Sequence, residues 1–266
     1  VDSIYKIPIM LNQEKVDDIV LKKLKLSSKK PNLKDWKRVI SAHTDPKSEV
    51  NIAMVGKYMD LKDAYKSLNE ALVHGGIQHE LRTNIKYVDS ENIDSRNVKK
   101  ILNNVDAILI PGGFGLRGIE GMVITAQYAR KNSVPFLGIC LGMQVAIIEY
   151  SRNVLRIKGA NSSEFDNKTK NPVIGLIHEW IDSAGSLERR DHNSDLGGTM
   201  RLGSQECFLL ENSLTSSLYG RQVIRERHRH RYEVNNNYIE QLESAGLSIV
   251  GKSRDKNLVE VSSFLE

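Results

Sequence analysis

Cysteine is scarce in this sequence, with only Cys140 and Cys207 among 266 residues. Two cysteines are too few for the disulfide framework of a small secreted domain, so a reducing, cytoplasmic location is the default expectation. The first residues lack the basic stretch followed by an apolar run that marks a secretory signal. No apolar run approaches the roughly 18 residues that a membrane-spanning helix needs. We therefore expect neither secretion nor association with a membrane.

A strong excess of one charge is also missing, since the formal net charge is only +5 and the sequence pI is near 9.0. The most basic stretch, RERHRHR at residues 225–231, would place Arg227, Arg229 and Arg231 on one face of a strand and the histidines on the other. Half of its charge would then point away from any single surface. No aromatic residues interleave the basic face, as single-strand binding prefers. We therefore expect no nucleic-acid partner.

The composition and hydrophobic pattern of the sequence change near residue 48. Residues 1–48 are polar and basic and are predicted to be a linker or lead-in with one short helix at 16–24. Residues 49–266 are predicted to form the main domain, which begins with alternating strands and helices. The strand-like segments are 50–56, 84–89, 106–110 and 134–140, and the helix-like segments are 63–76, 97–104, 121–133 and 141–154. This alternation predicts an α/β fold, a doubly wound and mostly parallel sheet with helices on both faces.

The second half of the chain is richer in strands. Strand-like segments occur at 199–210, 222–234 and 247–253, with one helix expected at 238–246. These strands are expected to extend the sheet and to form loops over its functional edge. The last residues, VSSFLE, are more typical of an amphipathic helix fragment than of a strand.

The most informative stretch is VPFLGICLGMQVAII at residues 134–148. An apolar strand meets Gly138, Cys140 and Gly142 and turns directly into a helix, which is the pattern of a nucleophile elbow. The glycines allow the strand and helix backbones to crowd the turn. A helix N-terminus favours the thiolate, so the pKa of the Cys140 thiol is expected to be lowered. Cys207 has no such context and is interpreted as a packing residue.

A glycine-rich loop, Pro111–Gly115, follows the predicted strand at 106–110. Because the carboxyl ends of parallel strands share one edge of a sheet, the loop should lie near Cys140. Backbone N–H groups in such a loop can stabilise the oxyanion that forms during acyl transfer. We therefore predict an oxyanion loop beside a cysteine nucleophile.

Five segments together carry a family resemblance: IPGGFGLRGIEGM, LGICLGMQVAIIEY, GANSSEFD, SDLGGTMRLG and ERHRHRYEVN. They resemble the C-terminal glutaminase half of CTP synthases, and the similarity runs from about residue 3 to residue 260. The GxCxG pattern alone would indicate only the class I glutamine amidotransferases. The resemblance implies hydrolysis of L-glutamine to glutamate and ammonia.

The resemblance also implies roles for individual residues. Cys140 would be the nucleophile, and Glu164 and Arg231 would hold the α-amino and α-carboxylate ends of glutamine. Opposite charges suit a zwitterionic ligand, and arginine binds carboxylate through its bidentate fork. The oxyanion and glutamine pocket would include Gly113, Leu141, Gly142, Met143 and Gln144. No cofactor or metal is expected in this domain.

Several partners follow from the same resemblance. An N-terminal synthetase domain, missing here, would use ATP and Mg²⁺ to aminate UTP to CTP with the ammonia. GTP would act as allosteric activator, with Arg117 as a candidate for its site, and the full-length protein would be a homo-oligomer, a tetramer. Val55-Gly56-Lys57 is not a phosphate loop, because GxxxxGK[ST] is absent.

The family completes its catalytic triad with a late His-Pro-Glu motif, whereas none of the seven histidines here is followed by Pro-Glu. We expect that motif to lie in residues omitted after about Glu260. The alternatives are that the chain ends here and lacks its base, or that His228 or His230 serves as a substitute base. The partner histidine and glutamate are thus not found in the printed chain. Two other interpretations stay open, a non-catalytic regulatory or assembly module and another elbow-cysteine hydrolase such as a γ-glutamyl peptidase.

Overall fold

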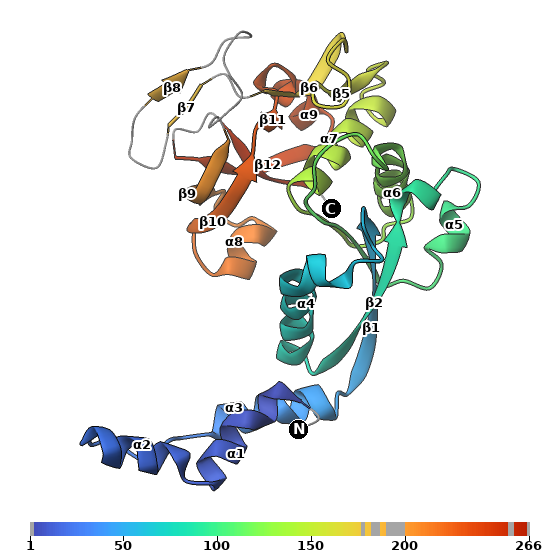
Figure 1. Ribbon diagram of the computed structural model, residues 1–266. Helices are drawn as coiled ribbons and strands as arrows, with labels where there is room; N and C mark the ends of the chain where they lie inside the picture. Colours follow the sequence, from blue (N-terminus) through green and yellow to red (C-terminus); the bar gives the residue numbers. More distant parts are fainter. Residues whose placement is uncertain (1–2, 177–178, 182–186, 190–199, 255–257, 265–266) are drawn as a thin grey trace. The chain divides into compact units, whose positions relative to one another are not determined.

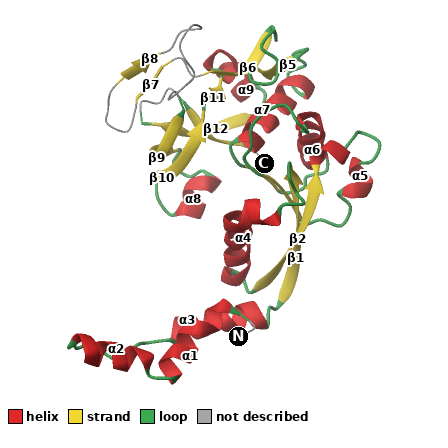
Figure 2. Ribbon diagram, viewed as in Figure 1, coloured by secondary structure: helices red, strands yellow, loops and turns green. Residues whose placement is uncertain are grey.

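The computed structural model describes residues 3–176, 179–181, 187–189, 200–254 and 258–264 (Figure 1). The chain separates into two compact units. The first comprises Val1–Ala53, Asp60–Lys86 and Asn104–Ala107, and the second comprises Met54–Met59, Tyr87–Asn103 and Ile108–Glu266. Figure 2 shows that helices dominate the N-terminal segment and that strands dominate the C-terminal half.

The N-terminal segment is more helical than predicted. It contains α1 (Ile7–Gln13), α2 (Val16–Leu24) and α3 (Lys34–Thr44), of which only α2 was expected. Long-range contacts tie it to α4 (Lys66–Gln78), because Tyr5 Oη donates to Glu70 at 3.1 Å. Trp36 Nε1 in turn donates to the carbonyl of Tyr5 at 2.7 Å. Such contacts join residues 31 to 65 positions apart and leave no local signal in the sequence.

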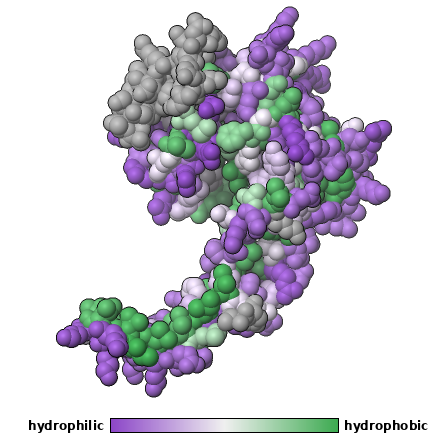
Figure 3. All heavy atoms as spheres, in the orientation of Figure 1, coloured by the Kyte–Doolittle hydropathy of each residue, from purple (hydrophilic) through white to green (hydrophobic). Residues whose placement is uncertain are grey.

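The N-terminal helices also expose apolar side chains, which gather over this segment in Figure 3. The exposed residues include Ile4, Ile7, Met10, Leu11, Ile19, Val20 and Leu24. Contiguous exposed apolar side chains usually mark a surface that contacts another protein.

One four-stranded sheet carries the first half of the fold. Its order is β2-β1-β3-β4, formed by Leu81–Asp89, Ser48–Gly56, Ala107–Ile110 and Phe136–Gly138. The helices that alternate with these strands include α5 (Val98–Ile101), α6 (Ile119–Lys131) and α7 (Leu141–Asn153). β3 and β4 are parallel, with Ile110 opposite Gly138. The predicted α/β fold with a parallel sheet is confirmed.

The core of this region is apolar and closed to solvent. Ile108, Leu109 and Ile110 of β3 are all at most 2% exposed, so the strand is buried on both faces, as is typical of parallel sheets. α6 packs against α7, and most of α7 is buried. The carboxyl end of β4 therefore leads into a helix that is itself mostly buried.

Among the described residues, the strands of the second half form sheets of their own, so the expectation that they would extend the first sheet is wrong. One sheet has the order β10-β9-β12-β13, formed by Val223–His230, Arg201–Leu209, Leu247–Ser253 and Val259–Phe264. Another has the order β11-β6-β5, formed by Tyr232–Val234, Asn171–Leu176 and Ala160–Ser162. A third pairs β7 (Glu179–Ile181) with β8 (Leu187–Arg189). Helices α8 (Leu214–Tyr219) and α9 (Ile239–Ser244) lie between strands in the sequence.

The expected helix in VSSFLE is wrong over the residues that the structure describes. Val259–Phe264 is β13, an antiparallel partner of β12 with Ile249 opposite Ser262. Backbone pairing with a buried strand outweighs the weak helical pattern of so short a segment. Among the described helices, none has both the length and the apolar character needed to cross a membrane.

Candidate active site

Cys140 occupies the sharp turn between β4 and α7. Its φ of +53° lies in the left-handed region, which residues other than glycine rarely adopt. Glycine is required on both sides of the turn. A Cβ at Gly138 would lie 2.5 Å from the carbonyl carbon of Gly142, and a Cβ at Gly142 would collide with the carbonyl oxygen of Ile110. The structure confirms the predicted strand–turn–helix geometry of a nucleophile elbow.

The thiol of Cys140 is partly buried, and this burial raises its pKa above the ordinary value of 9.0. A hydrogen bond from the Leu141 N–H lowers the pKa but offsets only part of the effect of burial. The charges of Glu233 and Glu164 raise the pKa further. The predicted lowering of the pKa is therefore wrong. One N–H group at the helix start does not offset burial and two carboxylates. The thiol is protonated at neutral pH and needs a base before it can act as a nucleophile.

The glycine-rich loop after β3 lies against this elbow. A Cβ built on Gly112 would be 3.5 Å from the Cβ of Cys140, and one on Gly113 would be 3.1 Å from Cδ2 of Leu141. The N–H of Ile139 donates to the carbonyl of Ile110 at 2.9 Å, which joins the ends of β3 and β4. The predicted neighbourhood of loop and cysteine is confirmed, since the backbone at Gly112 lies close to the Cβ of Cys140.

Glu164 and Arg231 lie in turns outside the strands, Glu164 after β5 and Arg231 before β11, and both charges act on Tyr232. Glu164 accepts a hydrogen bond from the N–H of Gly115 at 2.7 Å. Arg231 lies between β10 and β11, and among the described residues its buried Nε has no hydrogen-bond partner. Burial raises the pKa of Tyr232, while the charge of Glu164 raises it further and that of Arg231 lowers it. A carboxylate and a guanidinium thus lie near the same phenol.

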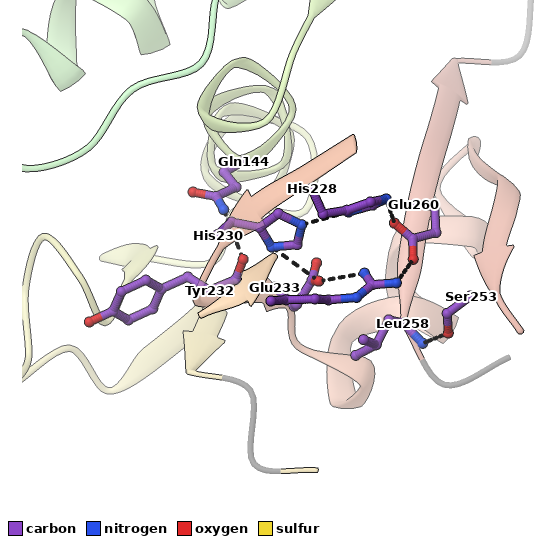
Figure 4. A network of polar contacts seen from close by, with 9 residues as sticks. Gln144, His228, His230, Tyr232, Glu233, Ser253, Leu258 and Glu260 are labelled. Carbon is purple, nitrogen blue, oxygen red and sulfur yellow. Dashed lines mark hydrogen bonds and ion pairs between the residues drawn. The ribbon is translucent and has the colours of Figure 1, made fainter. Parts of the chain in front are cut away.

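The start of α7 supplies the remaining predicted residues. Leu141, Gly142 and Gln144 are buried, whereas Met143 is half-buried. The side chain of Gln144 donates to the carbonyl of Tyr232 at 3.0 Å (Figure 4). Gln144 therefore ties the nucleophile helix to the Arg231–Tyr232 segment.

Five buried or half-buried polar side chains form a network beside this segment (Figure 4): Arg201, His228, His230, Glu233 and Glu260. Arg201 donates to Glu233 at 3.1 Å and to Glu260 at 2.5 Å. Nδ1 of His228 lies 2.8 Å from Nε2 of His230. The other ring nitrogens lie 3.5 Å from Glu260 and 3.2 Å from Glu233, respectively.

These contacts argue against either histidine as the catalytic base. The two rings contact each other, and their remaining nitrogens lie within ion-pair distance of Glu260 and Glu233. Burial, with the nearby charge of Arg201, lowers the pKa of His228 to about 3 and that of His230 to about 4. Such weakly basic rings are poor proton acceptors for a thiol whose own pKa is raised.

Arg117 is held by acidic side chains of its own chain. Its guanidinium lies 2.7 Å from Glu91, 3.9 Å from Asp89 and 5.2 Å from the centre of the Tyr58 ring. Contact with Glu91 raises the pKa of Arg117. These contacts explain the orientation of Arg117 without any ligand.

Sequence reasoning missed several residues of this region. Lys57 was considered only as part of a phosphate loop, although its ammonium group contacts the glycine-rich loop. Arg201, Glu233 and Glu260 were not singled out because their pairing depends on three different strands. Part of SDLGGTMRLG, residues 194–199, lies outside the described residues. Within the described ranges, no group of three or more His, Cys, Asp or Glu side chains is arranged to hold a metal ion.

Comparison with known proteins agrees with this geometry. The family model described as glutamine amidotransferase class-I matches residues 60–263. Among solved structures, the chain is similar to the glutaminase domain of Trypanosoma brucei CTPS with bound acivicin. The two share 37% sequence identity over 81% of this chain and 81% of that chain, with a TM-score of 0.71.

Proposed function

The chain belongs to the class I glutamine amidotransferase family, and we propose from this premise that it hydrolyses L-glutamine to glutamate and ammonia with Cys140 as the nucleophile. One observation carries the proposal. The strained cysteine of the elbow lies in contact with a glycine loop whose backbone can receive an oxyanion. A cysteine kept only for packing requires neither the positive φ nor the loop.

The first chemical step is attack by Cys140 Sγ on the side-chain amide carbon of glutamine. A sulfur–carbon bond forms, the carbonyl oxygen becomes an oxyanion, and the thiol proton passes to a base. Backbone N–H groups of Gly113 and Leu141 are proposed to stabilise that oxyanion, because both residues line the contact between loop and elbow.

The oxyanion then collapses, the carbon–nitrogen bond breaks, and ammonia leaves with the proton that the base returns. Water hydrolyses the resulting γ-glutamyl thioester and releases glutamate. Because the pKa of Cys140 is raised, the base is essential to this cycle. The His-Pro-Glu pair implied by the resemblance has no counterpart in the printed sequence.

Glu164 and Arg231 are proposed to bind the two charged ends of glutamine. The buried Nε of Arg231 without a hydrogen-bond partner is an unfulfilled donor of the kind that a substrate carboxylate satisfies. Glu164 would accept from the α-ammonium group while its other oxygen holds Gly115. The opposite charges of Glu164 and Arg231, which both act on Tyr232, match a zwitterion.

Replacing either charged residue should weaken glutamine binding. For Arg231→Ala and Glu164→Ala we expect the dissociation constant for L-glutamine to rise about 10- to 150-fold, because a charge-assisted contact contributes about 1.5–3 kcal/mol. Isothermal titration calorimetry measures this directly. Arg229→Ala, an exposed arginine on β10, is the matched control and should bind normally. Equal weakening in the control would assign the effect to general positive charge.

A direct test of the function is the stoichiometry of the reaction. The protein that carries this domain should release ammonia and glutamate in equal amounts from L-glutamine. A γ-glutamyl peptidase would instead prefer a γ-linked dipeptide over free glutamine. A non-catalytic module would release neither product.

We further propose that the ammonia serves an ATP- and Mg²⁺-dependent synthetase domain that aminates UTP to CTP. The similarity to the CTPS glutaminase domain supports this. The exposed apolar side chains of the N-terminal helices are a surface suited to such a domain. Residues 1–48 would then link the domains within a tetrameric protein. Supplying free ammonia should restore CTP formation in the Arg231→Ala protein, because ammonia bypasses the glutamine site.

GTP activation is proposed to act through Arg117, which lies within two residues of Gly115 in the sequence. Arg117→Ala should reduce the factor by which GTP stimulates glutamine hydrolysis, because the substitution removes a cation beside the glycine loop. Hydrolysis rates with and without GTP give the factor. If the factor stays unchanged, the contacts with Glu91 and Asp89 only hold the turn.

A further inference from the structure

Lys57 is a buried lysine whose ammonium group contacts the glycine-rich loop. It follows β1 directly and is only 5% exposed. Its Nζ donates to the carbonyl of Phe114 at 2.7 Å and also to the carbonyl of Gly115. These carbonyls come immediately after Gly112 and Gly113, the residues that lie against the elbow.

The same segment is held from its other side by Glu164. The N–H of Gly115 donates to Glu164 Oε1 at 2.7 Å, while its carbonyl accepts from Lys57. Gly115 has a φ of +77°, and apart from its chain neighbours no atom lies within 4 Å of the place where its Cβ would be. Glycine has little conformational preference of its own, so the shape of the loop at Gly115 depends on these polar contacts.

Burying an ammonium group is unfavourable unless it is well paired. Burial lowers the pKa of Lys57 below its ordinary value of 10.5, and the charge of Glu164 partly opposes this. An apolar residue of similar length would avoid the desolvation but would leave two carbonyls without their donor. The contacts to the loop backbone are therefore among those that stabilise this buried ammonium group.

We propose that Lys57 is a positioning residue for glutamine hydrolysis, which fixes the Phe114 and Gly115 carbonyls so that the N–H groups of the loop face the oxyanion formed by Cys140. The inference rests on the proposed function. Lys57 would act through the backbone and would not contact the substrate. Its loss should therefore impair oxyanion stabilisation more than binding of the charged ends of glutamine.

An aldehyde analogue of glutamine, with CHO in place of the side-chain amide, tests this directly. The Cys140 sulfur adds to the aldehyde carbon, the carbon–oxygen π bond becomes a single bond, and the thiol proton ends on that oxygen. No oxidant and no other reactant is needed. The hemithioacetal oxygen occupies the oxyanion position, so the affinity of the aldehyde reports the shape of the loop.

For Lys57→Met we expect the aldehyde to bind about 10- to 100-fold more weakly, somewhat less than the 10²–10³-fold effect of deleting an oxyanion donor. The affinity for L-glutamine, measured in Cys140→Ala proteins with and without Lys57→Met, should change less than about threefold, because the charged ends are still bound. Lys131→Met, an exposed lysine in the last turn of α6, is the matched control. Lys57→Arg, which keeps N–H donors, should recover part of the aldehyde affinity.

The outcomes separate the two claims. If the unmodified protein binds neither the aldehyde nor glutamine, the proposed function fails. If it binds both and Lys57→Met binds the aldehyde as tightly as Lys131→Met does, the role of Lys57 is overturned. Equal weakening of aldehyde and glutamine would also overturn it, since that pattern indicates general damage to the pocket. Thermal unfolding checks that Lys57→Met folds. If it does not, Lys57→Gln, which keeps an amide donor, is measured instead, and it should again weaken aldehyde binding more than glutamine binding.

Discussion

Replacing Arg201 by methionine is expected to destabilise the protein by about 3–5 kcal/mol, because it leaves buried carboxylates without their cation. The Arg201 and Glu260 side chains are each 3% exposed, and that of Glu233 is 6% exposed. Chemical denaturation gives the free energy of unfolding. Arg225→Met is the matched control, since that arginine pairs with Glu206 on the surface of the same sheet and its loss should change stability little.

The destabilisation caused by Arg201→Met should depend on pH. Burial raises the pKa of Glu233 to about 8 even with Arg201 present, so the folded state binds a proton that the unfolded state, with an ordinary value of 4.5, does not. The contribution of Glu233 to stability therefore falls as pH rises from about 4.5 to about 8, whereas the lowered pKa values of His228 and His230 add stability as pH rises to about 6.5. Without Arg201, which lowers that pKa, the fall should extend to higher pH. A loss equal to that of Arg225→Met at every pH would contradict the account of the network.

Replacing Cys140 by alanine should abolish glutamine hydrolysis, because no other thiol occupies an elbow. Removing the nucleophile of a catalytic triad in other enzymes lowers kcat by about 10⁶-fold. Cys207→Ala is the control: Cys207 is buried, and burial raises the pKa of its thiol to about 12. It should therefore retain activity. Ammonia release under saturating glutamine measures both variants.

Two results would count against this assignment. Hydrolysis retained by Cys140→Ala would require another nucleophile, and loss of activity in Cys207→Ala at unchanged stability would give that residue a chemical role. If Cys140→Ala still binds L-glutamine, the thiol acts in chemistry and not in substrate recognition.

Local sequence patterns predicted the parts of the fold that depend on local physics. The helix at 16–24 was predicted with its observed bounds, and the strand–turn–helix at Cys140 followed from the glycine spacing. The end of α4 was predicted wrongly, because Gly75–Gly76 looked like a helix stop. In the structure α4 continues to Gln78, and a Cβ at Gly76 would collide with Thr83, so this glycine serves close packing.

The candidate site was predictable where its residues follow strand ends and was not where they meet across the fold. Gly113 and Cys140 belong to segments that each have a recognisable glycine pattern in the sequence, and the structure brings those segments together. Lys57 meets Phe114 across 57 positions, and Arg201 meets Glu260 across 59. The pKa of Cys140 was misjudged for the same reason, since Glu233 and Glu164 approach it only in the folded chain.

The central claim, that Cys140 attacks glutamine bound between the glycine loop and the elbow, is tested most directly by a chloroketone analogue of glutamine. Peptide mapping by mass spectrometry locates the alkylated residue. Iodoacetamide, an electrophile without the α-amino and α-carboxylate groups of glutamine, is the comparison reagent. The account predicts one label per chain, on Cys140, formed faster than with iodoacetamide and suppressed by L-glutamine. Labelling that glutamine does not suppress, or that occurs on Cys207, would contradict it.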